Sequence, residues 1–174
     1  MMKKITLVVA LLATFGIGNA QSSYKQAIGA RVSPLSDYDV FAASYKVFLA
    51  KPSAIELNAG FGGNGVNYLG NSYRTNSFSV SGTYQHHFDI NPVEGLKWYI
   101  GGGATVFHTS SSYKSGGYNG TGVGLYPTGG VDYKFRNIPL NVSADWRPTF
   151  LVTAPAAYNN FLGDRVGVSA RYTF

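Results

Sequence analysis

Apolar and polar residues alternate along most of the chain after residue 24, which is the pattern of β-strands with two different faces. The same two-residue period recurs in eight segments, which are residues 25–33, 41–48, 55–62, 78–87, 97–106, 122–135, 140–150 and 165–174. Most of these segments have the length of about nine to twelve residues that a tilted strand needs to cross a bilayer. We therefore predict eight antiparallel strands.

The connections between these segments alternate between short and long. Three of them are short, and they are Ala50–Ser53, Asp89–Leu96 and Arg136–Pro139. Three of the others are long and rich in Gly, Asn, Ser and Tyr, and they cover residues 63–77, 108–121 and 151–163. Outer-membrane barrels have short periplasmic turns and long extracellular loops, and an even strand count places both termini on the short-turn side.

The first twenty residues have the three parts of a secretory signal peptide. Lys3 and Lys4 form a basic start, residues 5–18 are uncharged and apolar, and small residues lead to a cleavage point between Ala20 and Gln21. A helix over the apolar residues 5–18 would span about 21 Å, which is less than the ~30 Å thickness of the hydrocarbon core of a bilayer. We predict a signal peptide over residues 1–20 and a barrel domain over residues 21–174.

Composition removes several classes of function. Charged residues make up 13% of the chain, about half of the roughly 25% that is usual in soluble domains. The absence of cysteine excludes a disulfide scaffold, thiolate zinc sites, cysteine nucleophiles and an N-terminal lipid anchor. The net charge of +6 comes without a basic run, so we expect no nucleic-acid partner. We also predict no cofactor and no metal, since adjacent His86 and His87 would face opposite sides of a strand.

The distribution of aromatic residues favours a membrane barrel over a soluble one. The apolar face carries aromatic residues near the strand ends, namely Tyr24, Phe41, Phe61, Phe78, Trp98, Phe135, Phe150 and Phe174. Rings at both rims are typical of the interfacial girdles of transmembrane barrels. A soluble lipocalin-like barrel is the alternative, but it would expose more Lys and Glu. The sequence thus predicts the outer membrane of a diderm bacterium.

The last nine residues, Val-Gly-Val-Ser-Ala-Arg-Tyr-Thr-Phe, complete a resemblance to the small OmpA/OmpX-type outer-membrane barrels. The resemblance implies an all-β, eight-stranded antiparallel transmembrane barrel that is monomeric and surrounded by outer-membrane lipid and lipopolysaccharide. It implies that periplasmic chaperones and the barrel-assembly machinery act during biogenesis. The insertion signal would be Val168, Ala170, Tyr172 and Phe174, and we expect no periplasmic domain after Phe174.

The inward face of the predicted barrel carries a polar cluster, whose members are Lys46, Glu56, Asp132, Asp145, Arg147, Arg165 and Arg171. A tight turn after Ala50 would place Lys46 opposite Glu56, and a turn over Arg136–Pro139 would place Asp145 near Asp132. The arginines are then the expected partners of these acids, because an unpaired buried charge is very unfavourable. We favour a structural plug of ion pairs, and the alternative is a narrow, anion-attracting path or binding site for small solutes.

One pair of residues raises the question of catalysis. His108 and Ser110 partly resemble the His-x-Ser pair of the outer-membrane lipid A deacylases, and strand parity would point both towards lipid. A serine hydrolase also needs a group that orients its base, and residues 109–131 contain no Asp or Glu. We therefore expect His108 and Ser110 to be polar residues where a strand meets its loop, and not the catalytic residues of an enzyme.

The sequence favours a non-enzymatic surface barrel that serves envelope integrity, or adhesion to an extracellular ligand through its long loops. The long loops have the Tyr, Ser, Gly and Asn content of adaptable recognition surfaces. The alternatives are the narrow passage or binding site for small anionic solutes and a lipid A-modifying enzyme of the outer leaflet.

Overall fold

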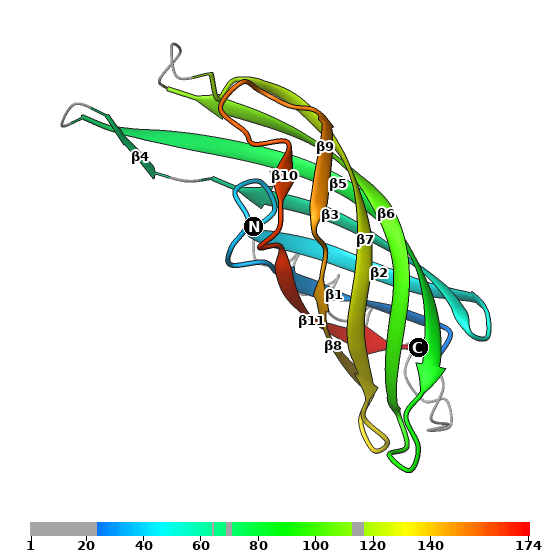
Figure 1. Ribbon diagram of the computed structural model, residues 1–174. Helices are drawn as coiled ribbons and strands as arrows, with labels where there is room; N and C mark the ends of the chain where they lie inside the picture. The colour runs from blue at the N-terminus through cyan, green and yellow to red at the C-terminus, as the bar shows by residue number, and fades with distance from the viewer. Residues whose placement is uncertain (1–23, 64, 69–70, 113–116) are drawn as a thin grey trace, which may run out of the picture.

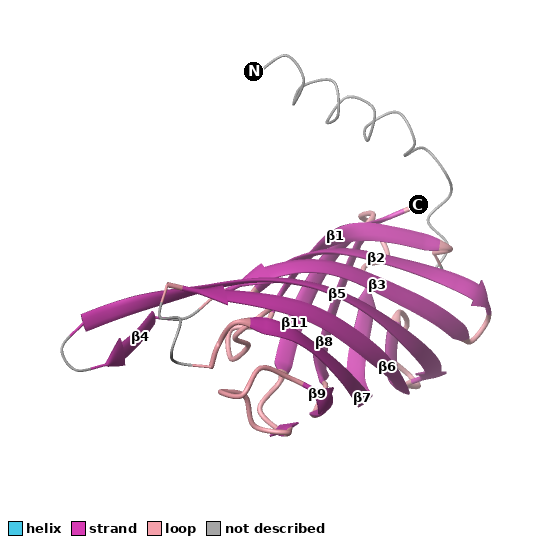
Figure 2. Cartoon of the chain, turned by 90° about the horizontal axis from the view of Figure 1, so that it is seen from above, coloured by secondary structure: helices cyan, strands magenta, loops and turns pink. Residues whose placement is uncertain are grey.

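The computed structural model describes residues 24–63, 65–68, 71–112 and 117–174. The predicted signal peptide and its cleavage point at Ala20 and Gln21 lie outside these residues. Within them, the secondary structure consists of strands joined by turns and loops (Figure 2). None of the described segments is a helix that is long and apolar enough to span a bilayer.

Eight strand positions close an antiparallel barrel (Figure 1). The strands are β1 (Gln26–Val32), β2 (Phe41–Ala50), β3 (Ser53–Gly62), β4 (Gly65–Tyr68), β5 (Asn71–Asp89), β6 (Leu96–Ser111), β7 (Gly120–Lys134), β8 (Leu140–Trp146), β9 (Thr149–Thr153), β10 (Phe161–Leu162) and β11 (Val166–Thr173). The wall runs β1-β2-β3-β5-β6-β7-β8-β11, and β11 pairs with β1. Strands β9 and β10 continue β8 and β11 beyond a break, so the predicted fold class is confirmed.

The wall has the register that the short turns predict. Lys46 of β2 lies opposite Glu56 of β3. Asp145 of β8 lies opposite Gly130 of β7, one inward position away from Asp132. Because side chains alternate between faces, this register fixes which residues enter the lumen.

The barrel is apolar outside and polar inside. Outward residues such as Phe78, Leu125 and Phe150 are 59%, 54% and 53% exposed. The lumen instead buries charged side chains, and Lys46 and Glu56 are both 0% exposed. Water-soluble proteins bury apolar residues and almost never bury an unpaired charge, so the polarity of this barrel is inverted.

The strands on one side reach further towards the loops than the alternation predicts. Strand β5 already begins at Asn71, and β6 continues to Ser111, so parts of the predicted loops 63–77 and 108–121 are strand. Strand β4 pairs with the start of β5 and forms a hairpin that projects from the barrel (Figure 1). The two-residue apolar period fades there, although the backbone pairing of the strands continues.

The predicted strand over residues 140–150 is interrupted at Arg147 and Pro148. The pairs Gly129↔Trp146 and Leu125↔Phe150 share one register, which places Pro127 opposite Pro148. Neither proline can donate a backbone hydrogen bond, so the ladder between β7 and its neighbour is broken there. The N–H group of Arg147 donates to the carbonyl of Arg165 at 2.8 Å instead.

Candidate functional site

The centre of the lumen is built around Glu56. Its Oε1 accepts a hydrogen bond from Arg147 Nη2 at 2.7 Å, and its Oε2 lies 2.9 Å from Arg171 Nη2. The amide groups of Gln85 and Asn58 donate to the same carboxylate at 2.8 and 3.1 Å. Glu56 therefore has two cationic partners and two neutral donors, which is the condition for keeping a charge in a dry interior.

Asp145 forms the second node of this network. Arg31 binds it with two parallel hydrogen bonds of 2.7 Å, and Arg147 binds it through Nε and Nη2 at 2.9 Å. The Tyr99 hydroxyl donates a further hydrogen bond at 3.0 Å. Bidentate guanidinium–carboxylate pairs are strong and fix orientation, so Arg147 joins the Glu56 and Asp145 nodes rigidly.

Asp132 is the third node and lies nearer to the short turns. Lys46 Nζ donates to Asp132 at 2.6 Å, and Asn141 Nδ2 donates at 2.8 Å. Arg171 connects other strands, because it donates to Ser44 at 2.9 Å and to Ser143 at 2.8 Å. Every strand of the barrel wall contributes a side chain to the three nodes or to their cations, so the network ties the wall together across the lumen.

The partners differ in part from those that the sequence suggests. Lys46 reaches across the lumen to Asp132 rather than to Glu56, because two arginines already hold Glu56. Arg165 lies outside this central cluster. The polar cluster predicted from the sequence does not include Arg31 and Tyr99, which both bind Asp145. Strand parity could have brought them into the cluster, since both share the inward face.

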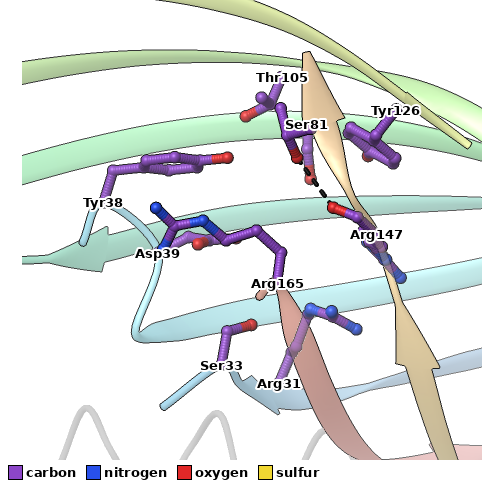
Figure 3. A pocket seen from close by; sticks show the side chains of 10 residues that line it. Arg31, Ser33, Tyr38, Asp39, Ser81, Thr105, Tyr126, Arg147 and Arg165 are labelled. Atoms are coloured by element: carbon purple, nitrogen blue, oxygen red, sulfur yellow. Dashed lines mark hydrogen bonds between the residues drawn. The ribbon is translucent and has the colours of Figure 1, made fainter. Parts of the chain in front are cut away.

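Arg165 belongs to the end of the barrel that carries the long loops. It donates to the carbonyl of Leu35 at 2.7 Å and to Asp37 at 2.9 Å, and its guanidinium lies 5.3 Å from the Tyr38 ring centre (Figure 3). Asp39, which bonds to Ser36, lines the same small pocket. Its pKa is raised by burial. The empty volume of this pocket is about 320 Å³, including space open to solvent.

The centre and the loop end of the lumen are together electrically balanced. In the described chain, its centre and loop end hold five buried cations, which are Arg31, Lys46, Arg147, Arg165 and Arg171. Five carboxylates face them, and these are Asp37, Asp39, Glu56, Asp132 and Asp145. The sequence suggests an excess of basic residues in the lumen because residues 33–40 are predicted to be a loop outside it. In the structure this loop supplies two of the five acids, Asp37 and Asp39.

An apolar cap covers the loop end. Tyr38 stacks on Phe107 with ring centres 4.2 Å apart, and Tyr158 packs against Phe107 at 5.2 Å. Leu151 completes this buried cluster. Burial raises the pKa of Tyr38 and, less strongly, that of Tyr158. Phe107 fits because Gly122 lies beneath it: a Cβ at residue 122 would be 2.3 Å from the ring.

The opposite end of the lumen is open at the short turns. A larger pocket lies there, with an empty volume of about 660 Å³ that includes space open to solvent. Tyr24, which the sequence places on the outer apolar face, lines this pocket instead, and its hydroxyl points to Asp132 at 3.4 Å. Tyr24 precedes β1, so the alternation of side chains along a strand does not determine the direction of its ring.

The His108–Ser110 pair has no catalytic arrangement among the described residues. Both residues lie on the outward face of β6 and are exposed. The His108 ring forms its hydrogen bond with Thr121 of β7, with Nδ1 3.0 Å from the hydroxyl oxygen. No described carboxylate forms an ion pair with His108, whereas a hydrolytic triad needs an orienting group for the base.

Aromatic pairs lie on the outer surface at both ends of the barrel. Phe41 and Phe61, and Phe150 and Phe161, pair near the loops with ring centres 5.8 and 4.9 Å apart. Near the short turns, the pairs are Phe88 with Trp98, Tyr133 with Phe135, and Tyr172 with Phe174. Val168, Ala170, Tyr172 and Phe174, the predicted insertion signal, all lie on this outer surface.

The comparisons with known proteins concern the fold. No protein-family model matches the chain, and no curated protein matches it. Among solved structures, the chain is similar to the crystal structure of Neisserial surface protein A (NspA), with 18% identity and a TM-score of 0.51. The match covers 88% of this chain and 98% of that one. The chain is thus an eight-stranded antiparallel β-barrel with the fold of that surface protein.

Proposed function

We propose that this protein is a non-enzymatic barrel of the bacterial outer membrane, exported by a signal peptide over residues 1–20. In this proposal its lumen is a structural plug, and its role is in the cell envelope or in surface contacts through the loop end. The observation that carries the proposal is the inverted polarity of the wall. A closed barrel satisfies its backbone groups in hydrocarbon, where an open sheet could not.

The aromatic rings at both ends support the membrane assignment. Their two levels enclose the outward aliphatic residues, among them Ile28, Leu57 and Val106, which are 41%, 49% and 48% exposed. Aromatic rings favour the interface between headgroups and hydrocarbon. The similarity to a surface protein adds support for the fold alone.

The tall side of the barrel supports a contact role for the loop end. Strands β5, β6 and β7 have 19, 16 and 15 residues, whereas β1, β8 and β11 have 7, 7 and 8. Strand β5 runs beyond the rest of the wall and pairs there with β4 (Figure 1). A projecting, strand-supported surface is suited to binding a partner outside the cell.

The network argues against the alternative of a narrow passage. Glu56, Asp132 and Asp145 with their cations separate the loop-end pocket from the short-turn pocket, and the apolar cap closes the loop end. An eight-stranded barrel is just wide enough for side chains to fill it. We expect no steady conductance when the folded protein is placed in a planar lipid bilayer, and a stable open level would contradict the plug.

Four measurements test the proposal. The folded protein should run faster on a denaturing gel before heating than after heating, and should fractionate with the outer membrane as a chain that begins at Gln21. Replacing residues 65–74 by a short Gly-Ser turn should keep the gel shift but reduce the adhesion of cells that carry the protein. Deletion of the whole protein, with no change in detergent sensitivity or adhesion, would contradict both roles.

The enzyme alternative has its own test. Mass spectrometry of outer-membrane lipids should give the same lipid A profile with and without the protein. Loss of one acyl chain only when the protein is present, reversed by His108→Ala, would replace this proposal by a lipid-modifying enzyme.

A further inference from the structure

The short-turn end of the lumen contains a pocket with room for a ring-sized group. Its cavity volume is about 200 Å³, which is smaller than the roughly 300–1,000 Å³ of sites for drug-sized ligands. Phe48 of β2, His87 of β5 and Lys134 of β7 line three of its sides. The Lys46–Asp132 pair closes it towards the centre of the barrel.

One wall of the pocket is a continuous row of rings. Tyr24 meets Phe48 edge to face with centres 5.2 Å apart, and Phe48 lies 5.0 Å from the His87 ring. His87 in turn lies 5.0 Å from Tyr99, deeper in the lumen. The row offers a flat apolar surface of the kind on which a ligand ring can stack.

His87 belongs to this wall through the face of its ring. The residue is only 2% exposed, and both ring nitrogens are buried and have no hydrogen-bond partner among the described residues. Its backbone N–H is paired with the carbonyl of Pro52. A molecule in the open pocket would therefore lie against the ring and would not reach its nitrogens.

The opposite side of the pocket carries ammonium groups without acid partners. Asp132 is held by Lys46 and Asp89 by Lys97. Lys134 Nζ instead donates to the backbone carbonyls of Phe135 and of Ile138, the latter at 2.9 Å. Among the described residues, no carboxylate lies within ion-pair distance of Lys134 or of Lys51, so this mouth has positive charge to spare.

We propose that the short-turn mouth binds a small organic anion that combines a flat apolar group with a carboxylate or phosphate. The apolar group lies against Phe48 and His87, and the anionic oxygens accept hydrogen bonds from Lys51 and Lys134. Charge-assisted hydrogen bonds are about twice as strong as neutral ones, and the partly enclosed mouth screens them less than open water does. In the proposed orientation, this site faces the periplasm and is separate from the loop-end surface.

The test uses the folded barrel in uncharged maltoside micelles, labelled with nitrogen-15, and titrates it with benzoate and with phenyl phosphate. We expect saturable shifts of the amides of His87, Lys97 and Lys134 and of the His87 ring. Tighter binding of benzoate would show that the site prefers a carboxylate, and tighter binding of phenyl phosphate would show that it prefers a phosphate. Equal shifts with neutral benzyl alcohol would show simple partitioning and overturn the proposal, as would the absence of saturation with either anion.

Matched variants locate the anion. Lys51→Gln and Lys134→Gln should each weaken binding by roughly tenfold, the loss of one charge-assisted hydrogen bond. Lys25→Gln removes the same charge from an exposed residue that does not line the pocket, and it should leave binding unchanged. Lys51 lies in an exposed turn, so its variant should fold even where Lys134→Gln does not. An equal response of Lys51→Gln and Lys25→Gln would overturn the site.

Discussion

The two ends of the lumen are closed to different degrees. At the loop end, Tyr38, Phe107 and Tyr158 form an apolar cap, and Asp37 and Asp39 balance the nearby arginines. At the short-turn end, the pocket is larger and its lysines exceed the available acids. One barrel wall thus carries one capped, neutral end and one open, basic end.

The length of the connections explains this difference. The loop over residues 33–40 is long enough to fold over the lumen and to place Tyr38 and Asp39 above it. The loop over residues 154–165 does the same with Tyr158 and Arg165. The turn at residues 51–52 has only two residues and cannot reach across the mouth. Closure therefore depends on loop residues that fold over the lumen and pack on strand residues such as Phe107.

Glu56→Gln should have the largest effect, because Glu56 belongs to the partition between the two ends. The change leaves Arg147 and Arg171 with one carboxylate fewer in a dry interior. Breaking a buried ion pair from one side costs about 3–5 kcal/mol of unfolding free energy. Urea unfolding of the barrel in lipid vesicles measures this loss.

Glu94→Gln is the matched control for that change. Glu94 pairs with Arg136 at 2.9 Å, but both side chains are more than half exposed. Such pairs contribute only about 0–1 kcal/mol. If both variants lost the same small amount, the central network would not be the partition that we describe, and the two ends would not be separated by a stabilising element.

Gly122→Val should open the loop end of the lumen, so that it resembles the open short-turn end. The new Cβ would lie 2.3 Å from Phe107, so the ring must leave the cap. Overpacking of this kind costs about 1–3 kcal/mol, and faster hydrogen exchange over residues 33–40 should accompany it. Gly129→Val is the control on the same strand, because its nearest atom would be 4.0 Å away. Equal exchange in both variants would contradict the cap.

The sequence predicts the wall far better than the ends. Alternation predicts all eight strand positions, and the short turns predict the opposition of Lys46 and Glu56, because a slip of one residue would invert every side chain. The partner of Lys46 is not predictable in this way, since a flexible side chain can cross a narrow lumen to Asp132. The cap and the role of Asp39 depend on how an irregular loop folds, for which the sequence has no periodic signal.

The pH dependence of stability should differ in sign between the two ends, starting with Asp39 at the loop end. Burial raises the pKa of Asp39 in the folded protein, so the folded chain takes up this proton more readily than the unfolded chain. The contribution of Asp39 to stability should therefore increase as the pH falls through its raised pKa towards its ordinary value of about 3.9. Asp39→Asn should remove this increase, and unfolding curves between about pH 4 and 7 compare the two proteins. Identical slopes would contradict the burial of this carboxyl.

Asp89→Asn should have the smallest effect and the opposite pH dependence. The hydrogen bond and the charge of Lys97 lower the pKa of this exposed carboxyl at the short-turn end. Its contribution is therefore present above the ordinary value of about 3.9 and is lost as the pH falls through the lowered pKa. Exposed ion pairs contribute about 0–1 kcal/mol, so the variant should unfold almost like the wild type at neutral pH. The change also leaves Lys97 beside the pocket without its acid, so benzoate should bind more tightly. Weaker benzoate binding to this variant would show that the basic excess does not govern the open end, and that the two ends differ in shape alone.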